Sequence, residues 1–182
     1  MNNNNYRNIE DTCITISELM LPSHANFSGK IHGGYILNLM DQIAFACASK
    51  HSTNYCVTAS VDTVNFINPI EVGELVTMKA SINYVGKTSM VVGIRVEAQN
   101  IQTGNTKHCN SSYFTMVAKD ENGNNSKVPG IIIRNDNEMR RFLEAIHRIE
   151  MKKNRQEQFD SDNFTSQDYL KSLENHNVRI EL

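Results

Sequence analysis

Apolar residues from Gly33 to about Lys50 recur at the spacing of a helix, which predicts one long helix in the first third of the chain. The small residues Ala44, Ala46 and Ala48 permit close packing, so this helix should be buried in the domain. The apolar side chains on its predicted inner face are Ile36, Leu37, Met40, Ile43, Ala44 and Cys47.

Segments rich in β-forming residues lie on both sides of this helix, and turn residues separate them. Pro22 ends the first, and turns follow at Asn68–Gly73, Gly86–Lys87 and Thr103–Asn105. The pattern predicts an α+β fold, in which a largely antiparallel sheet of five or more strands cradles the helix. The expected strands are Cys13–Leu21, Tyr55–Phe66, Glu74–Val85, Ser89–Asn100 and Thr106–Ala118.

The two ends of the chain differ from this central domain, which we place at residues 12–133. Residues 1–11 are rich in asparagine and are expected to be disordered. Residues 134–158 form a second amphipathic helix that should dock on the domain or on another subunit. Residues 159–182 are polar and are expected to be mobile or to fold late.

Composition narrows the possible partners and the compartment. The chain has 182 residues and a net charge of -2, so it lacks the basic surplus that nucleic-acid binding needs. It has no long apolar run and no secretory leader, which predicts a cytoplasmic protein without membrane insertion. The four cysteines form no C-x-x-C pair. We therefore expect reduced thiols, mostly buried, and no metal site.

The glycine pair before the long helix carries the chemistry of interest. Gly33 and Gly34 leave the first N–H groups of the helix open to a carbonyl oxygen that becomes an oxyanion. Asp41 follows Gly34 on the same helix face, about 10 Å along the axis. Two such helices packed antiparallel across a dimer would bring each Asp41 to the glycine loop of the other subunit. Asp41 is then a general base or a nucleophile, and Asn26 positions water or supports the oxyanion.

Each of these residues also has a structural interpretation. The glycines are compatible with a simple helix entry, and Asp41 with a structural acid paired to a base. Asn26 is typical of a turn. His32 is better explained by packing or by orientation of the loop than by proton transfer.

Four motifs in order give the segment a family resemblance. They are Ala25–Gly34, Leu39–Asp41, Val57–Phe66 and Gly86–Met90. Together they resemble the hotdog-fold acyl-CoA thioesterases, in particular brain acyl-CoA hydrolase and its single-domain bacterial relatives. The resemblance covers about residues 12–133, and the helix after Asp136 also resembles one that many of these relatives carry.

The resemblance implies hydrolysis of acyl-CoA to fatty acid and CoA, by homodimers that commonly form trimers of dimers. It implies catalytic roles for Asn26, Asp41 and the N–H of Gly34, in a site composed across the dimer. CoA is part of the substrate, and no separate cofactor is implied. The residues expected to bind substrate or CoA are His32, Gly33, Gly86, Lys87, Thr88, Ser89 and Arg134.

Three other functions remain open from the sequence. A non-catalytic acyl-CoA sensor would bind ligand in the same pocket without turnover. A hydratase or dehydratase would alter the acyl chain and leave the thioester intact, although His32 lacks the proline context expected for that class. In an oligomeric scaffold, Asp41 would be only a structural acid. The acyl chain length stays undetermined.

Overall fold

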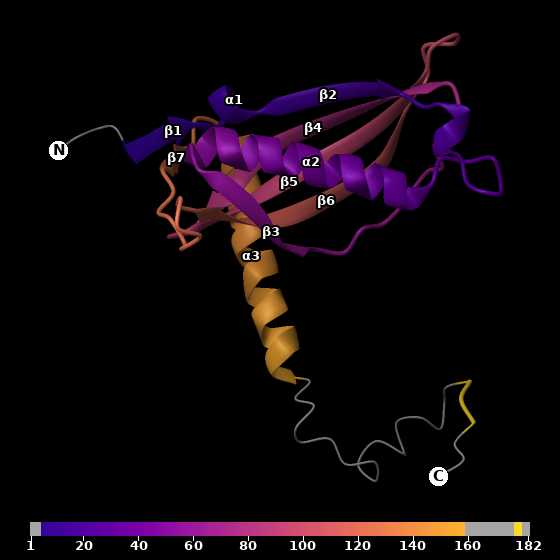
Figure 1. Ribbon diagram of the computed structural model, residues 1–182. Helices are drawn as coiled ribbons and strands as arrows, with labels where there is room; N and C mark the ends of the chain where they lie inside the picture. The colour runs from indigo at the N-terminus through magenta and orange to yellow at the C-terminus, as the bar shows by residue number, and fades with distance from the viewer. Residues whose placement is uncertain (1–4, 159–176, 180–182) are drawn as a thin grey trace. The chain divides into compact units, whose positions relative to one another are not determined.

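A five-stranded antiparallel sheet with one long helix on its face forms the body of the protein (Figure 1). The computed structural model describes residues 5–158 and 177–179. The sheet has the order β2-β4-β5-β6-β3, and every neighbouring pair is antiparallel. Its strands are β2 (Ile14–Leu19), β3 (Tyr55–Val61), β4 (Glu74–Val85), β5 (Ser89–Asn100) and β6 (Thr106–Lys119). The predicted α+β fold is confirmed.

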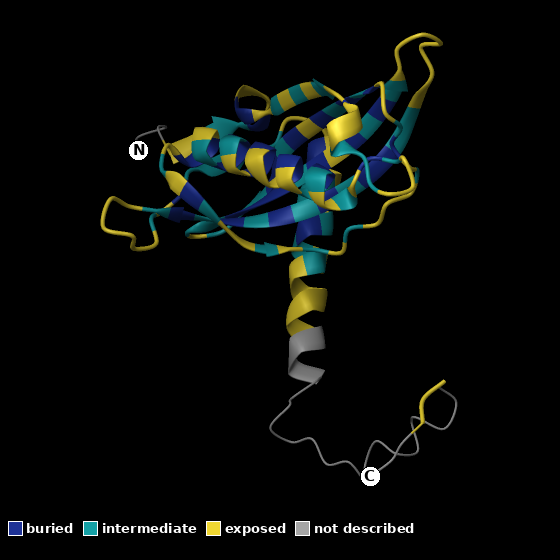
Figure 2. Cartoon of the chain, turned by 45° about the vertical axis from the view of Figure 1, so that its right-hand side comes forward, coloured by how far each residue is buried: buried dark blue, intermediate teal, exposed yellow. Residues whose placement is uncertain are grey.

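Helix α2 (Gly33–Ser52) lies across the sheet, and the core fills the space between them (Figure 1). Met40, Ala44 and Cys47 are fully buried on its inner side. The opposite side is exposed, so burial alternates along the helix (Figure 2). Alternate residues of β4 and β5 face the same core, as the period of a strand requires.

The chain divides into two compact units, residues 1–145 and 146–182, and helix α3 (Asp136–Gln158) begins in the first. In the first unit Ala145 is fully buried, and the ring of Phe142 lies 5.3 Å from that of Tyr84 on β4. The first compact unit therefore includes the start of α3 as far as Ala145. The predicted tail, residues 159–182, lies outside the described residues except for 177–179.

The disorder expected for residues 1–11 is wrong from Tyr6 onward. Residues Tyr6–Asn8 form β1, which pairs in parallel with β7 (Gly130–Ile132), and Ile9–Thr12 form the short helix α1. Ile9 is buried, and the guanidinium of Arg7 donates a hydrogen bond to the Lys50 carbonyl (3.0 Å). A Cβ at Gly130 would approach the Tyr6 ring to 2.5 Å, so a larger residue in β7 would require this ring to move.

The third strand is shorter than the pattern predicts. It ends at Val61 after a bulge between Thr58 and Ser60. Residues 62–67 stay beside β6 through isolated hydrogen bonds, such as that from the Ile67 N–H to the Cys109 carbonyl (2.9 Å). β3 is an edge strand, and its outward residues are exposed.

His51 links the end of α2 to the core and makes stability sensitive to acid. It is fully buried, and its Nε2 lies 3.0 Å from the Pro129 carbonyl, so Nε2–H donates. Burial lowers the pKa of His51 below 6.5, despite the hydrogen bond to Pro129, and the charge of Arg7 adds to the lowering. Below about pH 6.5 the His51 imidazole therefore binds a proton in the unfolded chain but not in the folded chain, and the free energy of unfolding falls.

We expect His51→Gln, which keeps a donor and does not titrate, to reduce this acid sensitivity. The loss of unfolding free energy between pH 7.5 and 5.5 should be smaller in the variant than in the wild type, because the variant has no imidazole that takes up a proton on unfolding. Denaturant unfolding at both pH values measures it. The difference between the two pH values is the test, since the variant has its own stability at pH 7.5. An equal acid loss in both proteins would contradict the assignment.

Candidate active site

The loop before α2 is folded around the side chain of Asn26. Its Oδ1 accepts hydrogen bonds from the Ser28 N–H (2.9 Å), the Ser28 hydroxyl (2.7 Å) and the Lys30 N–H (3.2 Å). The Asn26 N–H donates to the Lys30 carbonyl (2.7 Å). The carboxamide oxygen is thus used by the loop, and the Nδ2 donor is the part of Asn26 available to a ligand.

His32 is the N-cap of α2 and acts on the glycine pair directly. Its Nδ1 accepts a hydrogen bond from the Gly34 N–H (3.1 Å). The amide expected to be open to a carbonyl oxygen is therefore occupied by an imidazole in this structure. His32 and Gly34 are both exposed, so a ligand oxygen can reach this position by displacing the ring. A Cβ at Gly33 would lie 3.2 Å from the Phe66 ring, which shows how closely residues 62–67 approach the start of the helix.

Asp41 lies on the exposed side of α2 and is held by the edge strand. Its Oδ1 accepts a hydrogen bond of 2.6 Å from the hydroxyl of Thr58 on β3. The same hydroxyl lies 3.5 Å from the sulfur of Met116 on β6. Asp41 is not part of the apolar core, so its helix does not bury an unpaired charge. It presents one free carboxylate oxygen beside an open sheet edge.

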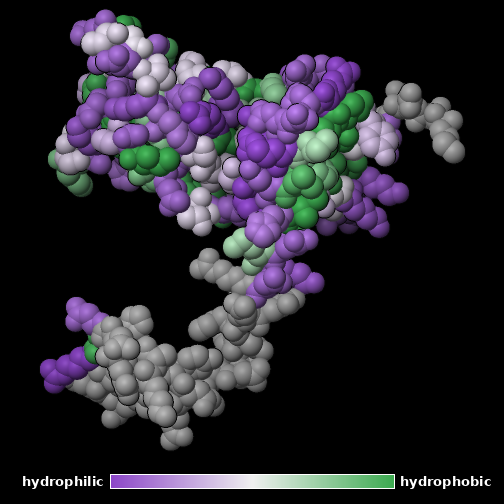
Figure 3. Space-filling view, turned by 180° about the vertical axis from the view of Figure 1, so that it is seen from behind, coloured by the Kyte–Doolittle hydropathy of each residue, from purple (hydrophilic) through white to green (hydrophobic). Residues whose placement is uncertain are grey.

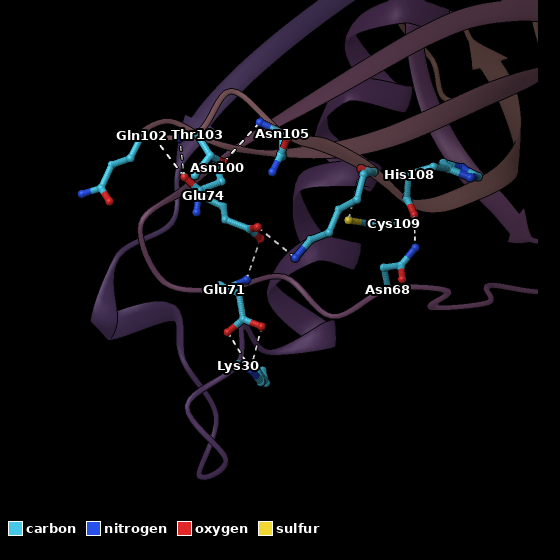
Figure 4. Close-up of polar contacts among 11 residues, drawn as sticks. Lys30, Asn68, Glu71, Glu74, Asn100, Gln102, Thr103, Asn105, His108 and Cys109 are labelled. Carbon is cyan, nitrogen blue, oxygen red and sulfur yellow. Dashed lines mark hydrogen bonds and ion pairs between the residues drawn. The ribbon is translucent and has the colours of Figure 1, made fainter.

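A chain of charged groups supports the Asn26 loop from the far side. Lys30 Nζ pairs with both Glu71 oxygens (2.6 and 2.7 Å), and the Glu71 N–H donates to Glu74 Oε2 (2.8 Å) (Figure 4). Glu74 is buried, and its Oε1 pairs with Lys107 (2.8 Å). The Ile31 N–H also donates to the Ile70 carbonyl (2.9 Å). The loop is thereby attached to the start of β4.

We expect Glu74→Ala to destabilise the protein by about 1–3 kcal/mol, because it leaves the Glu71 N–H and the Lys107 ammonium without their acceptor. Glu71→Ala is the matched control. Its pair with Lys30 is about half exposed, and its loss should cost at most about 1 kcal/mol. Denaturant unfolding of both variants measures the difference. Equal losses would show that Glu74 does not support this region.

The other predicted binding residues lie at the opposite end of α2. Ser89 pairs with Val117 on one side of β6 and Val57 pairs with Val117 on the other, so the Gly86–Ser89 turn lies at the end of the sheet where β3 begins. The 20 residues of α2 span about 30 Å between this turn and the glycine pair. Arg134 is exposed between β7 and α3, and Lys87 is exposed in the turn. One copy of the chain does not bring all the predicted site residues together.

The thiols and the carboxylates define what chemistry is available. All four cysteines are free, and Cys47, Cys56 and Cys109 are buried, as predicted. Burial raises the pKa of Cys47 to about 12, which removes it as a nucleophile. Among residues 5–158 and 177–179, no group of three His, Cys, Asp or Glu side chains is placed to hold a metal. The available chemistry is an exposed carboxylate, a carboxamide and the N–H groups of a helix start.

Thr58 is the site residue that sequence reasoning missed. It lies in Val57–Phe66, one of the segments that carry the family resemblance, yet no local pattern separates it from the neighbouring Thr63 or Ser60. Only the position of β3 beside α2 in the folded protein shows that the Thr58 hydroxyl reaches Asp41.

An antiparallel sheet of five strands around one long central helix is the arrangement of the hotdog fold. Sequence comparison agrees, since the profile of the thioesterase superfamily matches residues 28–105. Protein VdlD of Helicobacter pylori is 45% identical over 78% of this chain and 80% of its own. An uncharacterized acyl-CoA thioester hydrolase of Bacillus subtilis, YkhA, is 31% identical over 75% and 79%. The chain belongs to the thioesterase superfamily, and the predicted resemblance is confirmed.

Solved structures and a eukaryotic relative extend this result. An apo hexameric acyl-CoA thioesterase matches with a TM-score of 0.80 and 35% identity over 82% of this chain and 96% of that one. An acyl-CoA hydrolase from Staphylococcus aureus, in complex with butyryl coenzyme A, coenzyme A and its disulfide, matches with a TM-score of 0.78 and 27% identity over 92% and 98%. The human cytosolic acyl coenzyme A thioester hydrolase is 31% identical over 78% of this chain, and the match covers 38% of that protein.

In the part of the chain that the structure describes, no helix is long and apolar enough to cross a membrane.

Proposed function

We propose that this protein hydrolyses acyl-CoA to a free acid and CoA, at a site built from two copies of the chain. The observation that carries the proposal is the exposed carboxylate of Asp41, which the Thr58 hydroxyl holds at 2.6 Å beside an open sheet edge. Asp41 is the attacking group or the base for water, and Thr58 orients it. Acyl-CoA and water are the substrates, the free acid and CoA are the products, and the proposed reaction needs no separate cofactor.

Relatives of known structure support these assignments. The S. aureus acyl-CoA hydrolase has also been solved with an asparagine, an aspartate or a threonine replaced by alanine. Those three residues stand 15 and 17 positions apart along that chain. Asn26, Asp41 and Thr58 have the same order and the same spacing here. The shared spacing supports Asn26, Asp41 and Thr58 as residues of the proposed site.

The thioester carbonyl binds at the start of α2 in this proposal. Its oxygen replaces His32 as the acceptor of the Gly34 N–H, and Gly33 keeps the entry free of side chains. The Nδ2 group of Asn26 donates to the same oxygen or to the attacking water. The Gly86–Ser89 turn with Lys87, and Arg134, bind the CoA portion through their N–H groups and charges.

In a homodimer, predicted site residues that lie far apart in one chain can meet across the interface. Three such dimers give a hexamer. The edge of β3 and the exposed side of α2 carry apolar side chains that a partner would cover. Phe27 is fully exposed, and Phe45, Tyr55, Val61 and Phe66 are between 39% and 64% exposed. Strand pairing across β3 and antiparallel packing of two α2 helices would place Asp41 of one chain near the glycine pair of the other.

The experiment is turnover of short, medium and long acyl-CoAs, followed by the loss of thioester absorbance, since native thiols complicate a thiol reagent. Hydrolysis of at least one chain length supports the proposal and gives the chain preference. Binding of acyl-CoA without turnover would contradict it and indicate a sensor. A change in the acyl chain with the thioester intact would indicate a hydratase.

Thr58→Val should lower kcat about 10-fold to 100-fold, because a hydrogen bond to a charged carboxylate is worth about 1.5–3 kcal/mol. Thr58→Ser is the matched control, since it keeps the hydroxyl and should retain most of the activity. Steady-state kinetics of both variants measure the effect. Equal activity of the valine and serine variants would remove the hydroxyl from the mechanism.

A further inference from the structure

A cavity of about 440 Å³ lies on the face of the sheet opposite α2, away from the proposed active site. Residues of β4, β5 and β6 line it together with Cys13–Thr15 and the first turns of α3. The ribbon shows α3 on the side of the sheet away from α2 (Figure 1). Much of this side of the molecule is hydrophilic (Figure 3). The lining contains uncharged hydrogen-bonding side chains from two strands, namely Ser81 and Asn83 on β4 and Ser111 and Tyr113 on β6.

Asn83 shows that this floor is built into the sheet. It is 95% buried, and its Oδ1 accepts a hydrogen bond from the Ser81 hydroxyl (3.1 Å). Its amide group lies over Gly93 on β5, where a Cβ would come within 2.3 Å of Nδ2. The glycine therefore leaves room for a buried amide that faces the cavity.

The charges around the cavity are unequal. Lys79, Arg95, Arg140 and Arg141 line it, whereas Glu144 is the one acid in the lining. Lys79 and Arg95 each bind a different oxygen of Glu97 at 2.8 Å. These two hydrogen bonds, first that of Lys79, hold the pKa of Glu97 at about 2. Even with Glu97 counted, the positive charges exceed the negative ones by two.

Several donors of these side chains have no acceptor. Arg140 pairs with Glu144 (2.5 Å), but the guanidinium of Arg141 makes no hydrogen bond or ion pair with any residue that the structure describes. Arg95 binds Glu97 through Nε, which leaves both terminal nitrogens of its guanidinium available. Two guanidinium groups and an ammonium, carried by β4, β5 and α3, thus converge with donors to spare.

We propose that this cavity binds a phosphate-bearing anion. A guanidinium group binds two phosphate oxygens at once. The unpaired donors, the hydroxyls and the Asn83 amide can together bind more oxygen atoms than one carboxylate has. Although Ile14 and Ile94 also line the cavity, its charged groups are mostly basic, which favours an anion. The volume falls in the range of small-molecule sites and exceeds what a single phosphate group fills. The ligand is either the phosphate portion of coenzyme A or a separate phosphorylated compound.

The test is calorimetric titration of the full-length protein with inorganic pyrophosphate, beside the variants Arg141→Gln and Lys79→Gln. We expect saturable binding that weakens with salt, and at least a tenfold loss of affinity in each variant. Lys127→Gln removes an exposed charge outside the cavity and should bind as the wild type does. Thermal unfolding without ligand verifies that the variants are folded. No saturable binding, or an equal affinity in all four proteins, would overturn the proposal.

A second titration, with coenzyme A present at saturation, distinguishes the two sources. If coenzyme A prevents pyrophosphate binding in the wild type, and Arg141→Gln also weakens the binding of coenzyme A, the phosphates of coenzyme A fill the cavity. Simultaneous binding of both shows a separate ligand. Either result supports a phosphate site. Neither readout uses turnover, so the site can fail while the proposed hydrolysis stands, and the reverse.

Discussion

Asp41→Ala should lower kcat for acyl-CoA hydrolysis by about 10²–10⁴, the usual loss when a general base is removed. The carboxylate is exposed and is fixed by the Thr58 hydroxyl at 2.6 Å, so its loss removes a reacting group without opening the core. Affinity for acyl-CoA should survive, since the substrate contacts proposed at Gly34 and at the Gly86–Ser89 turn remain. Steady-state kinetics, with equilibrium binding of a non-hydrolysable acyl-CoA analogue, separate the two effects.

Two variants control this result. Glu121→Ala removes an exposed carboxylate from the turn after β6 and should leave kcat unchanged. Asp41→Asn keeps the size of the side chain and the acceptor for Thr58, but it can act neither as base nor as nucleophile. It should be nearly as inactive as Asp41→Ala. Substantial activity in Asp41→Asn would reduce Asp41 to a structural acid.

The sequence predicts the framework well because the framework follows from periodicity. Helix α2 begins at Gly33 as expected, since apolar spacing and a glycine entry are both local signals. β4 and β5 have the predicted bounds because turn residues frame them on each side. The sequence also singles out Asp41 as a candidate, because it is an acid within a mostly apolar helix, but it does not show that this side chain is exposed.

What the sequence does not predict depends on contacts between distant segments. Residues 6–8 are polar and resemble a disordered start, yet they form β1 by pairing with β7, far along the chain, where Gly130 lies against the Tyr6 ring. The occupation of the Gly34 N–H by His32 is a rotamer choice at a helix cap. The hydrogen bond from Thr58 to Asp41 requires the register of an edge strand against a helix, which pattern alone does not fix.

The quaternary arrangement of the site has its own test, and its expected effect is large. Asn26→Ala and Asp41→Ala homo-oligomers should each be weakly active or inactive. In a mixed dimer, one site collects both substitutions and the other collects neither, if each site takes Asn26 from one chain and Asp41 from the other. Random assembly should then restore about one quarter of the wild-type turnover, because half of the dimers are mixed and each has one intact site. Co-expression with two affinity tags and tandem purification measures the activity of the mixed species.

The hydrogen bond between Thr58 and Asp41 supplies the matched control. Both residues belong to the same chain, so a mixture of Asp41→Ala with Thr58→Val never regenerates an intact pair. Its turnover should not exceed what the Thr58→Val chains contribute alone. Rescue by Asn26→Ala without rescue by Thr58→Val would locate the boundary between the subunits inside the site, between the Asn26 loop and the Asp41–Thr58 pair. No rescue in either mixture would place the whole site within one chain, and the partner would then contribute only burial of the exposed Phe45 and Phe66.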